Sequence, residues 1–262
     1  MMAKVTMFGT LLDDIFDSYG TLEELGPFDH AIQRWDLGAL HELPDYMKVF
    51  IGALFDTFND LEKEIRGEGN VYRVEYLREA MKVQSKVHYQ ELLWGHNKYV
   101  PKFHEHLQIS AVSTTYPLIY VTSLVGMGDI ATKEVFDWVI KVPQIIWSAS
   151  LVCRLFDDIY PNEIEQENDQ VPTSVQCYAI EHGLSKEEAR LNISEVLLED
   201  EWKRMNEELI KPDQGIPLAV YMPAFNMACV MAEAYKQGDG FNNPESDMKD
   251  NVSMILVDRV TI

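Results

Sequence analysis

Residues 143–156 form a stretch in which nearly every side chain is apolar, so a helix built from it is apolar around its circumference. Such a helix must be covered on every side, which predicts a place in the middle of a helical domain. Pro143 suits the first turn because no amide hydrogen is needed there. Asp157 and Asp158 follow directly, and carboxylates at the end of a buried helix need a cation or hydrogen-bond donors.

The remainder of the chain shows helical periodicity and no strand pattern. Apolar residues recur at spacings of three and four along residues 44–61 and again along residues 72–94. Further helices are expected to begin near residues 102, 132, 172, 185, 217 and 247. The chain has 262 residues and an ordinary globular composition, so we predict one all-α domain over residues 1–262.

Two prolines predict local breaks. A capping box beginning at Thr21 predicts a short helix that residues 26–27 would stop. Pro117 falls inside the apolar part of the helix expected from about residue 102, and its ring predicts a kink there. The hydroxyls of residues 113–115 either satisfy the carbonyls freed by this kink or serve a function.

The charge balance argues against several partners. The chain has 43 acidic residues against 22 Lys and Arg, a formal net charge of −21, which disfavours binding to nucleic acid or to an anionic membrane. An anionic substrate would need metal ions to bridge it to such a protein. No apolar stretch reaches about 18 residues, so we expect no membrane span. Cys153, Cys177 and Cys229 are widely spaced, which favours reduced thiols over disulfides.

The first residues predict neither a signal peptide nor an ordinary helix start. Only Lys4 is basic before the first acids, and no small-residue cleavage site precedes them. The apolar run begins at once, without a capping residue. We therefore expect the chain to be a truncated product or gene model.

The acidic motif DDIFD at residues 13–17 closes this first helix. Asp13 and Asp17 are four apart and fall on one helix face, while Asp14 lies about 100° round from Asp13. Like charges at that spacing repel unless a cation lies between them, and carboxylate oxygens suit Mg²⁺. A solvated acidic helix end is the alternative. The apolar residues before the motif and the unfavourable helix dipole favour the metal site.

A second acidic cluster follows the central helix. Asp157, residue 161 and Glu165 are spaced by four and would share a helix face, with Arg154 just before them. Taken alone, this cluster fits a solvated helix end equally well. Two acidic helix ends facing each other across a cavity could hold several Mg²⁺ ions, which would bind and polarise a diphosphate.

Together these motifs resemble the C-terminal catalytic part of plant class I terpene synthases, over essentially the whole chain. The matching motifs are DDIFDSYGT at residues 13–21, CRLFDD at 153–158, YKQGDGF at 235–241 and LVD at 256–258. The resemblance implies a helical bundle around a central apolar pocket, without the family's first helices and N-terminal domain. It also implies about three Mg²⁺ ions, or Mn²⁺ in their place, that trigger departure of diphosphate from a prenyl diphosphate.

The same resemblance implies the substrate and the setting. By likeness to sesquiterpene enzymes we expect farnesyl diphosphate, with geranyl diphosphate as the second candidate. The product would be a terpene hydrocarbon or alcohol. We expect a cytoplasmic monomer, or a plastid protein if a transit peptide precedes Met1.

Individual residues take their roles from the matched motifs. The implied metal ligands are Asp13, Asp14, Asp17, Asp157 and Glu165. The implied substrate contacts are Asp13, Asp17, Arg154, Asp157, Thr114, Tyr116 and Phe241, and the implied catalytic residues are Asp13, Asp17, Arg154, Tyr235 and Asp239. Oxygen ligands suit the metals, a guanidinium suits phosphate oxygens, and aromatic faces stabilise a cation. Thr114, Tyr116, Trp147 and Phe156 fit plain core as well as a pocket wall.

The chain departs from the family pattern in three places. Pro161 stands where the family has a Ser or Thr metal ligand, and proline offers no side-chain oxygen. Asn168 and Asp169 stand where Arg-Gly is common, which replaces a positive charge with a negative one. The family's upstream Arg-x-Arg element would lie before Met1. These departures predict a divergent or impaired enzyme.

Two other classes compete with this interpretation. A prenyl chain-elongating synthase would need a second DDxxD, and residues 157–161 lack its final Asp. A helical protein without catalytic activity is the other, and it differs in not being stabilised by Mg²⁺ and a diphosphate. His104 and His106 fit surface residues better than zinc ligands.

Overall fold

In the computed structural model, the described residues are 1–66, 69–160, 171–236, 238–240 and 247–258. They form helices, and the only β-type pairing within these ranges is an isolated bridge between Lys236 and Gly238. This confirms the predicted all-α class. The α-helices are α1 (Met2–Asp14), α2 (Leu22–Arg34), α3 (Asp45–Ile65), α4 (Tyr72–His96), α5 (Phe103–Ser113), α6 (Tyr116–Val125), α7 (Lys133–Val139), α8 (Gln144–Ile159), α10 (Ser174–His182), α11 (Lys186–Asn192), α12 (Leu198–Ile210), α13 (Leu218–Ala234) and α14 (Asp247–Leu256).

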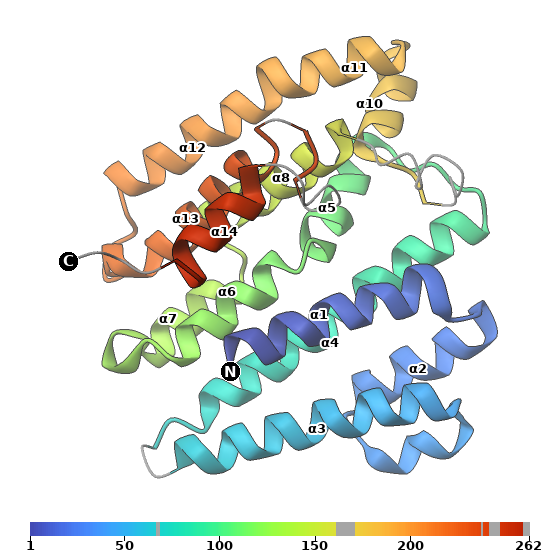
Figure 1. The fold of residues 1–262 in the computed structure, drawn as a ribbon, viewed down its shortest axis with the longest axis vertical. Helices are drawn as coiled ribbons and strands as arrows, with labels where there is room; N and C mark the ends of the chain where they lie inside the picture. The colour runs from blue at the N-terminus through green and yellow to red at the C-terminus, as the bar shows by residue number, and fades with distance from the viewer. Residues whose placement is uncertain (67–68, 161–170, 237, 241–246, 259–262) are drawn as a thin grey trace.

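The bundle is built around helices α4, α6 and α8. Helix α6 packs against both α4 and α8, so it lies between the two halves of the bundle (Figure 1). Helices α2 and α3 cover α4 on one side, and α12 and α13 cover α8 on the other. Short helical turns join these elements: π-helices η1 (Ile15–Tyr19) and η5 (Ile193–Leu197), and 3-10 helices η2 (Leu37–Glu42) and η4 (Gly128–Ile130).

Helix α8 is the central helix that its composition predicts. It contacts α5, α6, α10, α12 and α13, and its buried side chains point to several sides of the helix: Ile145, Ile146, Ala149, Leu151, Val152 and Leu155. Full burial of one such Leu or Ile side chain is worth about 1.5–3 kcal/mol. The cost of bringing the carboxylates of its C-terminal turn into the bundle is therefore offset within the same helix.

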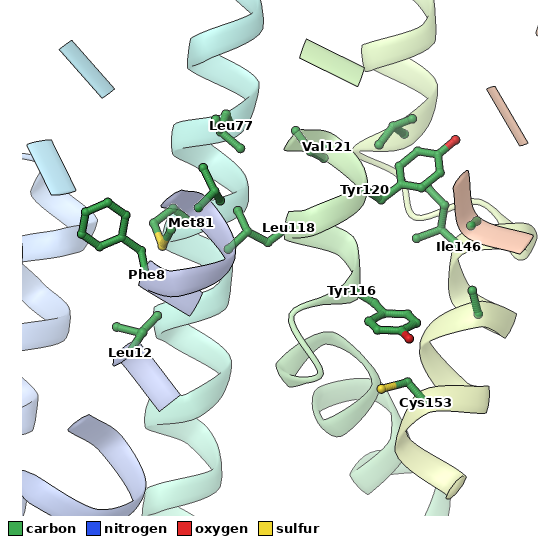
Figure 2. Packing of buried hydrophobic residues seen from close by; sticks show 14 of the residues in the cluster. Phe8, Leu12, Leu77, Met81, Tyr116, Leu118, Tyr120, Val121, Ile146 and Cys153 are labelled. Atoms are coloured by element: carbon green, nitrogen blue, oxygen red, sulfur yellow. The ribbon is translucent and has the colours of Figure 1, made fainter. Parts of the chain in front are cut away.

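A second region of the core lies where α1 meets α4 and α6. Phe8 and Leu12 of α1 are buried in one cluster with Met81 of α4 and Leu118 of α6 (Figure 2), and the Phe8 ring lies edge-on to Phe50 of α3 at a centroid distance of 5.7 Å. On the opposite side of α6, the Tyr116 ring faces Cys153 of α8 (Figure 2). Phe8 and Leu12 thus anchor the helix just before the first acidic motif, whereas Met7 and Leu11 of the same apolar run are exposed, so only one face of the run is buried.

The helix predicted to stop at residues 26–27 continues through them. The capping box of Thr21 and Glu24 is present, but α2 runs unbroken to Arg34 with Pro27 inside it. The prediction that the helix stops at residues 26–27 was therefore wrong. Pro27 removes the hydrogen bond to the carbonyl of Glu23, and both residues are exposed, so water can satisfy that carbonyl.

The kinked helix expected around Pro117 is instead two helices. Helix α5 ends at Ser113, and α6 begins at Tyr116 with Pro117 in its first turn. Thr115 between them adopts the left-handed conformation with φ +68°, which is uncommon for a β-branched residue. The chain therefore breaks before the proline, because Pro117 is accommodated at a helix start, where it displaces no hydrogen bond.

No single helix in the described part of the chain is long and apolar enough to cross a membrane. One bent pair of helices, α7 with α8 at 47°, passes on length and composition. Helix α8 is the buried centre of the bundle described above.

The tight contact between α1 and the break at Thr115 gives a first prediction. A Cβ atom at Gly9 would lie 2.6 Å from Thr115 Cγ2, so Gly9→Ala should lower the free energy of unfolding by about 1–3 kcal/mol through overpacking. Urea denaturation would measure it. Gly52 of α3 has no atom within 4 Å of its Cβ position, so Gly52→Ala should instead stabilise by about 0.5–1 kcal/mol. Equal effects would show that Thr115 moves aside freely.

Candidate active site

The first acidic motif lies where α1 passes into a π-helical turn. Helix α1 ends at Asp14, and η1 carries Asp17, with the Gly20 amide donating to the Ile15 carbonyl at 2.8 Å. The regular α-helix predicted through Asp17 is thus wrong. Ile15 and Phe16 of this turn are both buried. The Asp13 side chain is half-exposed, while Asp14 and Asp17 are exposed.

Two side chains of α4 face Asp13. His88 Nδ1 lies 3.5 Å from Asp13 Oδ1 and 3.8 Å from Glu91 Oε2. Neither His88 nor Glu91 belongs to a motif that predicts it from the sequence. The signal that could have identified them is the helical periodicity of α4. Leu77 and Met81 lie on its buried face, and residues 84, 88 and 91 continue that face at spacings of three and four.

Burial shifts the proton affinity of these two groups in opposite directions. Desolvation, helped by the positive charge of Arg154, lowers the pKa of His88 to about 3. Desolvation raises the pKa of Glu91 to about 7, although Arg154 and a hydrogen bond from Ser113 oppose the rise. His88 is therefore neutral at pH 7, and Glu91 is poised between its two protonation states.

Arg154 is the positive centre of the second cluster. Its Nη1 donates to Asp157 Oδ2 at 2.9 Å and to Asp158 Oδ1 at 3.2 Å. Its Nε donates to the Ser110 carbonyl at 3.2 Å, and its Nη2 lies 3.5 Å from Ser113 Oγ. The carboxylates hold the pKa of Arg154 well above its ordinary value, so the guanidinium stays charged despite its burial.

Ser113 joins the two acidic motifs. Its hydroxyl donates to Glu91 Oε1 at 2.9 Å and faces Arg154 on the other side. A continuous polar path therefore runs from Asp13 through His88, Glu91, Ser113 and Arg154 to Asp157. The structure brings together Asp13, Arg154 and Asp157, which the sequence places on two distant helices.

Tyr235 closes the far end of this path. Its hydroxyl donates to Asp157 Oδ1 at 2.7 Å, and its ring stacks between Phe156 and Tyr160 at centroid distances of 6.0 and 5.8 Å. Burial raises the pKa of Tyr235, and the neighbouring carboxylate of Asp157 raises it further. Desolvation also raises the pKa of Asp157, and Asp239 is close enough for its charge to add to that rise.

Asp158 is a structural neighbour of the site. Its Oδ2 accepts from the Ser174 amide at 2.6 Å, which ties the end of α8 to the start of α10. His106 lies beside this contact, with Nε2 at 2.8 Å from the Pro172 carbonyl and Nδ1 at 3.1 Å from Ser110 Oγ. The prediction of a surface position for His106 was wrong, because α5 packs against α8 and α10 and buries the ring.

The hydroxyls of Thr114 and Tyr116 make contacts with the main chain. Thr114 Oγ1 donates to the Ala111 carbonyl at 2.7 Å, and Tyr116 Oη donates to the Met227 carbonyl at 3.0 Å. The Thr114 contact agrees with the alternative that hydroxyls of residues 113–115 satisfy carbonyls freed at the break, whereas Tyr116 bonds to a carbonyl of the distant helix α13. The Tyr116 ring lies against α8, while Trp147 and Phe156 are half-buried.

The carboxylates suit a metal that keeps most of its own waters. Within the described ranges, no three His, Cys, Asp or Glu side chains are placed to hold one ion together. The side chains of Asp13 and Asp157 are 49% and 42% exposed, so a hydrated ion can reach their oxygens. Mg²⁺ typically takes one or two carboxylates and completes its shell with water and substrate phosphates, so this donor set fits it. Glu165, Phe241 and Pro161 lie outside the described residues.

Comparison with known proteins assigns the chain to a family. A profile described as the metal binding domain of the terpene synthase family matches residues 1–204. Sesquiterpene synthase 2 of Toona sinensis and (-)-germacrene D synthase of Vitis vinifera are each 38% identical over 262 residues, which is 100% of this chain and 47% of each relative. The chain therefore belongs to the terpene synthase family, and it spans about half the length of these relatives.

Solved structures give the same assignment for the fold. Isoprene synthase from grey poplar, in complex with three Mg²⁺ ions and dimethylallyl-S-thiolodiphosphate, matches with a TM-score of 0.88 at 30% identity, over 99% of this chain and 49% of that one. Limonene synthase with 2-fluorolinalyl diphosphate matches with a TM-score of 0.89 at 29% identity, over 98% of this chain and 47% of that one. The predicted class I terpene synthase fold is confirmed.

Proposed function

We propose that this chain carries the catalytic site for the Mg²⁺-dependent ionisation of a prenyl diphosphate to a terpene. The observation that carries the proposal is the polar path from Asp13 to Asp157 with the buried guanidinium of Arg154 within it. Acidic groups outnumber basic ones along this path, so its net negative charge favours the binding of metal cations. The named relatives are sesquiterpene synthases, which favours farnesyl diphosphate over geranyl diphosphate as substrate.

Asp13, Asp14 and Asp17 of the first motif and Asp157 and Glu165 of the second motif would hold the metal ions. Bound Mg²⁺ would neutralise charge on the diphosphate and polarise its bond to the prenyl carbon. Asp157 already accepts hydrogen bonds from Arg154 and Tyr235, so its two oxygens are oriented before a metal arrives. Asp14 and Asp17 are exposed and would be ordered by the metal.

The positive charge of Arg154 would stabilise the diphosphate as it leaves. In the ionisation step the carbon–oxygen bond breaks, both electrons leave with the diphosphate, and an allylic cation remains. A guanidinium can donate two parallel hydrogen bonds to phosphate oxygens, which stabilises the charge that develops there. The stacked faces of Phe156, Tyr160 and Tyr235 offer the π electrons that stabilise a nearby carbocation.

The test is incubation of the purified chain with farnesyl diphosphate and Mg²⁺, followed by extraction and gas chromatography. We expect a terpene product, and we expect Asp13→Asn to remove it, because the amide cannot supply the charge that a Mg²⁺ ligand needs. Geranyl diphosphate in a parallel reaction decides the substrate class. The melting temperature with Mg²⁺ and inorganic diphosphate measures binding separately, since a ligand of the folded state must stabilise it.

Pro161→Ser separates an impaired enzyme from an inactive one. Product from the Pro161→Ser variant alone would attribute the loss to Pro161, which offers no metal-binding oxygen. No product from either chain, together with no rise in melting temperature, would contradict the proposal and favour a helical protein without catalytic activity.

A further inference from the structure

Gln84 and His88 are two buried polar side chains one turn apart on α4. Gln84 is 1% exposed and His88 is 3% exposed, and both continue the stripe on which Leu77 and Met81 pack into the core. Buried polar groups on an apolar stripe cost stability unless they are hydrogen-bonded. Their contacts are therefore informative about their role.

The contacts of Gln84 fix the direction of its amide. Its Nε2 lies 2.9 Å from the Ser113 carbonyl, 2.8 Å from His88 Nε2 and 3.2 Å from Thr115 Oγ1. A carbonyl only accepts hydrogen bonds, so the amide nitrogen and not the amide oxygen must face Ser113. The same nitrogen then donates to His88 Nε2, which must carry a lone pair.

The tautomer of His88 follows from this contact. A neutral imidazole has one protonated nitrogen, and Nε2 is the acceptor, so the proton is on Nδ1. His88 Nδ1 is the atom that faces Asp13 Oδ1 at 3.5 Å and Glu91 Oε2 at 3.8 Å. The His88 ring also stacks on Phe16 with a centroid distance of 5.8 Å and an angle of 20°, which fixes its plane.

Thr115 connects this pair back to α1. Thr115 holds the left-handed conformation at the break between α5 and α6, and its Cγ2 occupies the space left by the missing side chain of Gly9. Asp13 lies one turn after Gly9 on α1. The side chains of Gln84, His88 and Thr115 therefore surround the end of α1 that presents Asp13.

We propose that Gln84 and His88 are a positioning pair, in which Gln84 sets the tautomer of His88 and His88 orients the carboxylate of Asp13 through its Nδ1–H. This role rests on the proposed function, because it concerns Asp13 as a metal ligand. A neutral donor orients a carboxylate without cancelling its charge, so the carboxylate keeps its affinity for Mg²⁺. A lysine or arginine at residue 88 would compete with the metal instead. Neighbours of this kind typically change metal affinity about 10–100-fold.

The test uses His88→Phe and His88→Asn. Phenylalanine keeps the stacking on Phe16 and removes both ring nitrogens, while the amide nitrogen of asparagine can take the place of Nδ1. With Mg²⁺ and inorganic diphosphate as the probe, calorimetry should show binding about 10-fold weaker for His88→Phe, and His88→Asn should recover part of it. Ser85→Ala is the matched control: Ser85 is a buried residue of the same helix as His88, its hydroxyl donates to Asp29 of α2 at 2.7 Å, and its loss should leave binding unchanged.

A second readout reports the tautomer without any metal. Nitrogen-15 NMR of the histidine side chains should show His88 protonated on Nδ1 and not on Nε2, and Gln84→Met should disturb that signal. Protonation of His88 on Nε2 would contradict the proposal that Gln84 sets its tautomer. Wild-type binding by His88→Phe would overturn its role toward Asp13. Absence of binding by the unmodified chain would overturn the proposed function and that role with it, while the NMR signal would still decide the Gln84–His88 contact.

Discussion

Replacing Glu91 with glutamine is expected to stabilise the protein at pH 8 relative to the unmodified chain, and to have little effect at pH 4.5. Burial raises the pKa of Glu91 from 4.5 to about 7. A group whose pKa is raised on folding contributes its stability below the unfolded value, and that contribution is lost as the pH rises through the folded value. The loss between pH 4.5 and pH 8 is ~3 kcal/mol, at about 1.4 kcal/mol for each tenfold change in proton affinity. The glutamine side chain would not be ionised, and its carbonyl can still accept from Ser113.

The measurement is urea denaturation of both proteins across this pH range. Glu201→Gln is the matched control, because Glu201 is also buried and accepts from the Ser148 hydroxyl at 2.6 Å, but it pairs with Arg204. Loss of that pair should destabilise the control at pH 8. A Glu91→Gln variant that is less stable than the unmodified chain at pH 8 would show that Glu91 is ionised and fully compensated by Arg154.

Predictions that rested on local chemistry transferred well to the structure. The capping box predicted at Thr21 is present, and a helix begins at Lys186 as expected near residue 185, because a helix start depends on residues within one turn. The burial of α8 followed from its composition alone, since a helix without a polar face has no side to present to water.

Predictions that depended on solvent exposure or on distant contacts did not. Pro27 sits within α2 because the carbonyl that it leaves unpaired is exposed. The break at Thr115 depends on space beside Gly9, which belongs to a helix about 100 residues earlier in the chain.

The candidate site divides in the same way. The motifs predicted Asp13, Arg154 and Asp157, but periodicity alone gave no partner for them. Glu91 and His88 are recognised as site residues only when α4 is known to pass beside α1. The role of a single polar residue on an apolar helix face cannot be inferred until its hydrogen-bond partner is known. The structure supplies that neighbour through packing of α1 against α4.

Replacing Arg154 with methionine is expected to cost about 3–5 kcal/mol of stability at pH 8, because it leaves carboxylates buried without their cation. The positive charge of Arg154 lowers the pKa of both Glu91 and Asp157, against the effect of burial. Without it both pKa values rise further, so the variant should lose stability more steeply as the pH increases. As the pH falls toward 4.5, protonation of these acids removes buried negative charge, and the deficit should shrink toward the cost of the lost hydrogen bonds.

Arg73→Met is the matched control for this variant. Arg73 is also buried, but it donates to the main-chain carbonyls of Val125 and Gly128, at 3.2 and 2.8 Å. Its loss should cost the same at both pH values, since carbonyls do not titrate. Urea denaturation of the two variants at pH 4.5 and pH 8 therefore separates charge from packing. A loss of stability in Arg154→Met that does not change with pH would mean that the guanidinium stabilises the protein through its hydrogen bond to the Ser110 carbonyl. The folded protein would then need no cation beside its buried carboxylates.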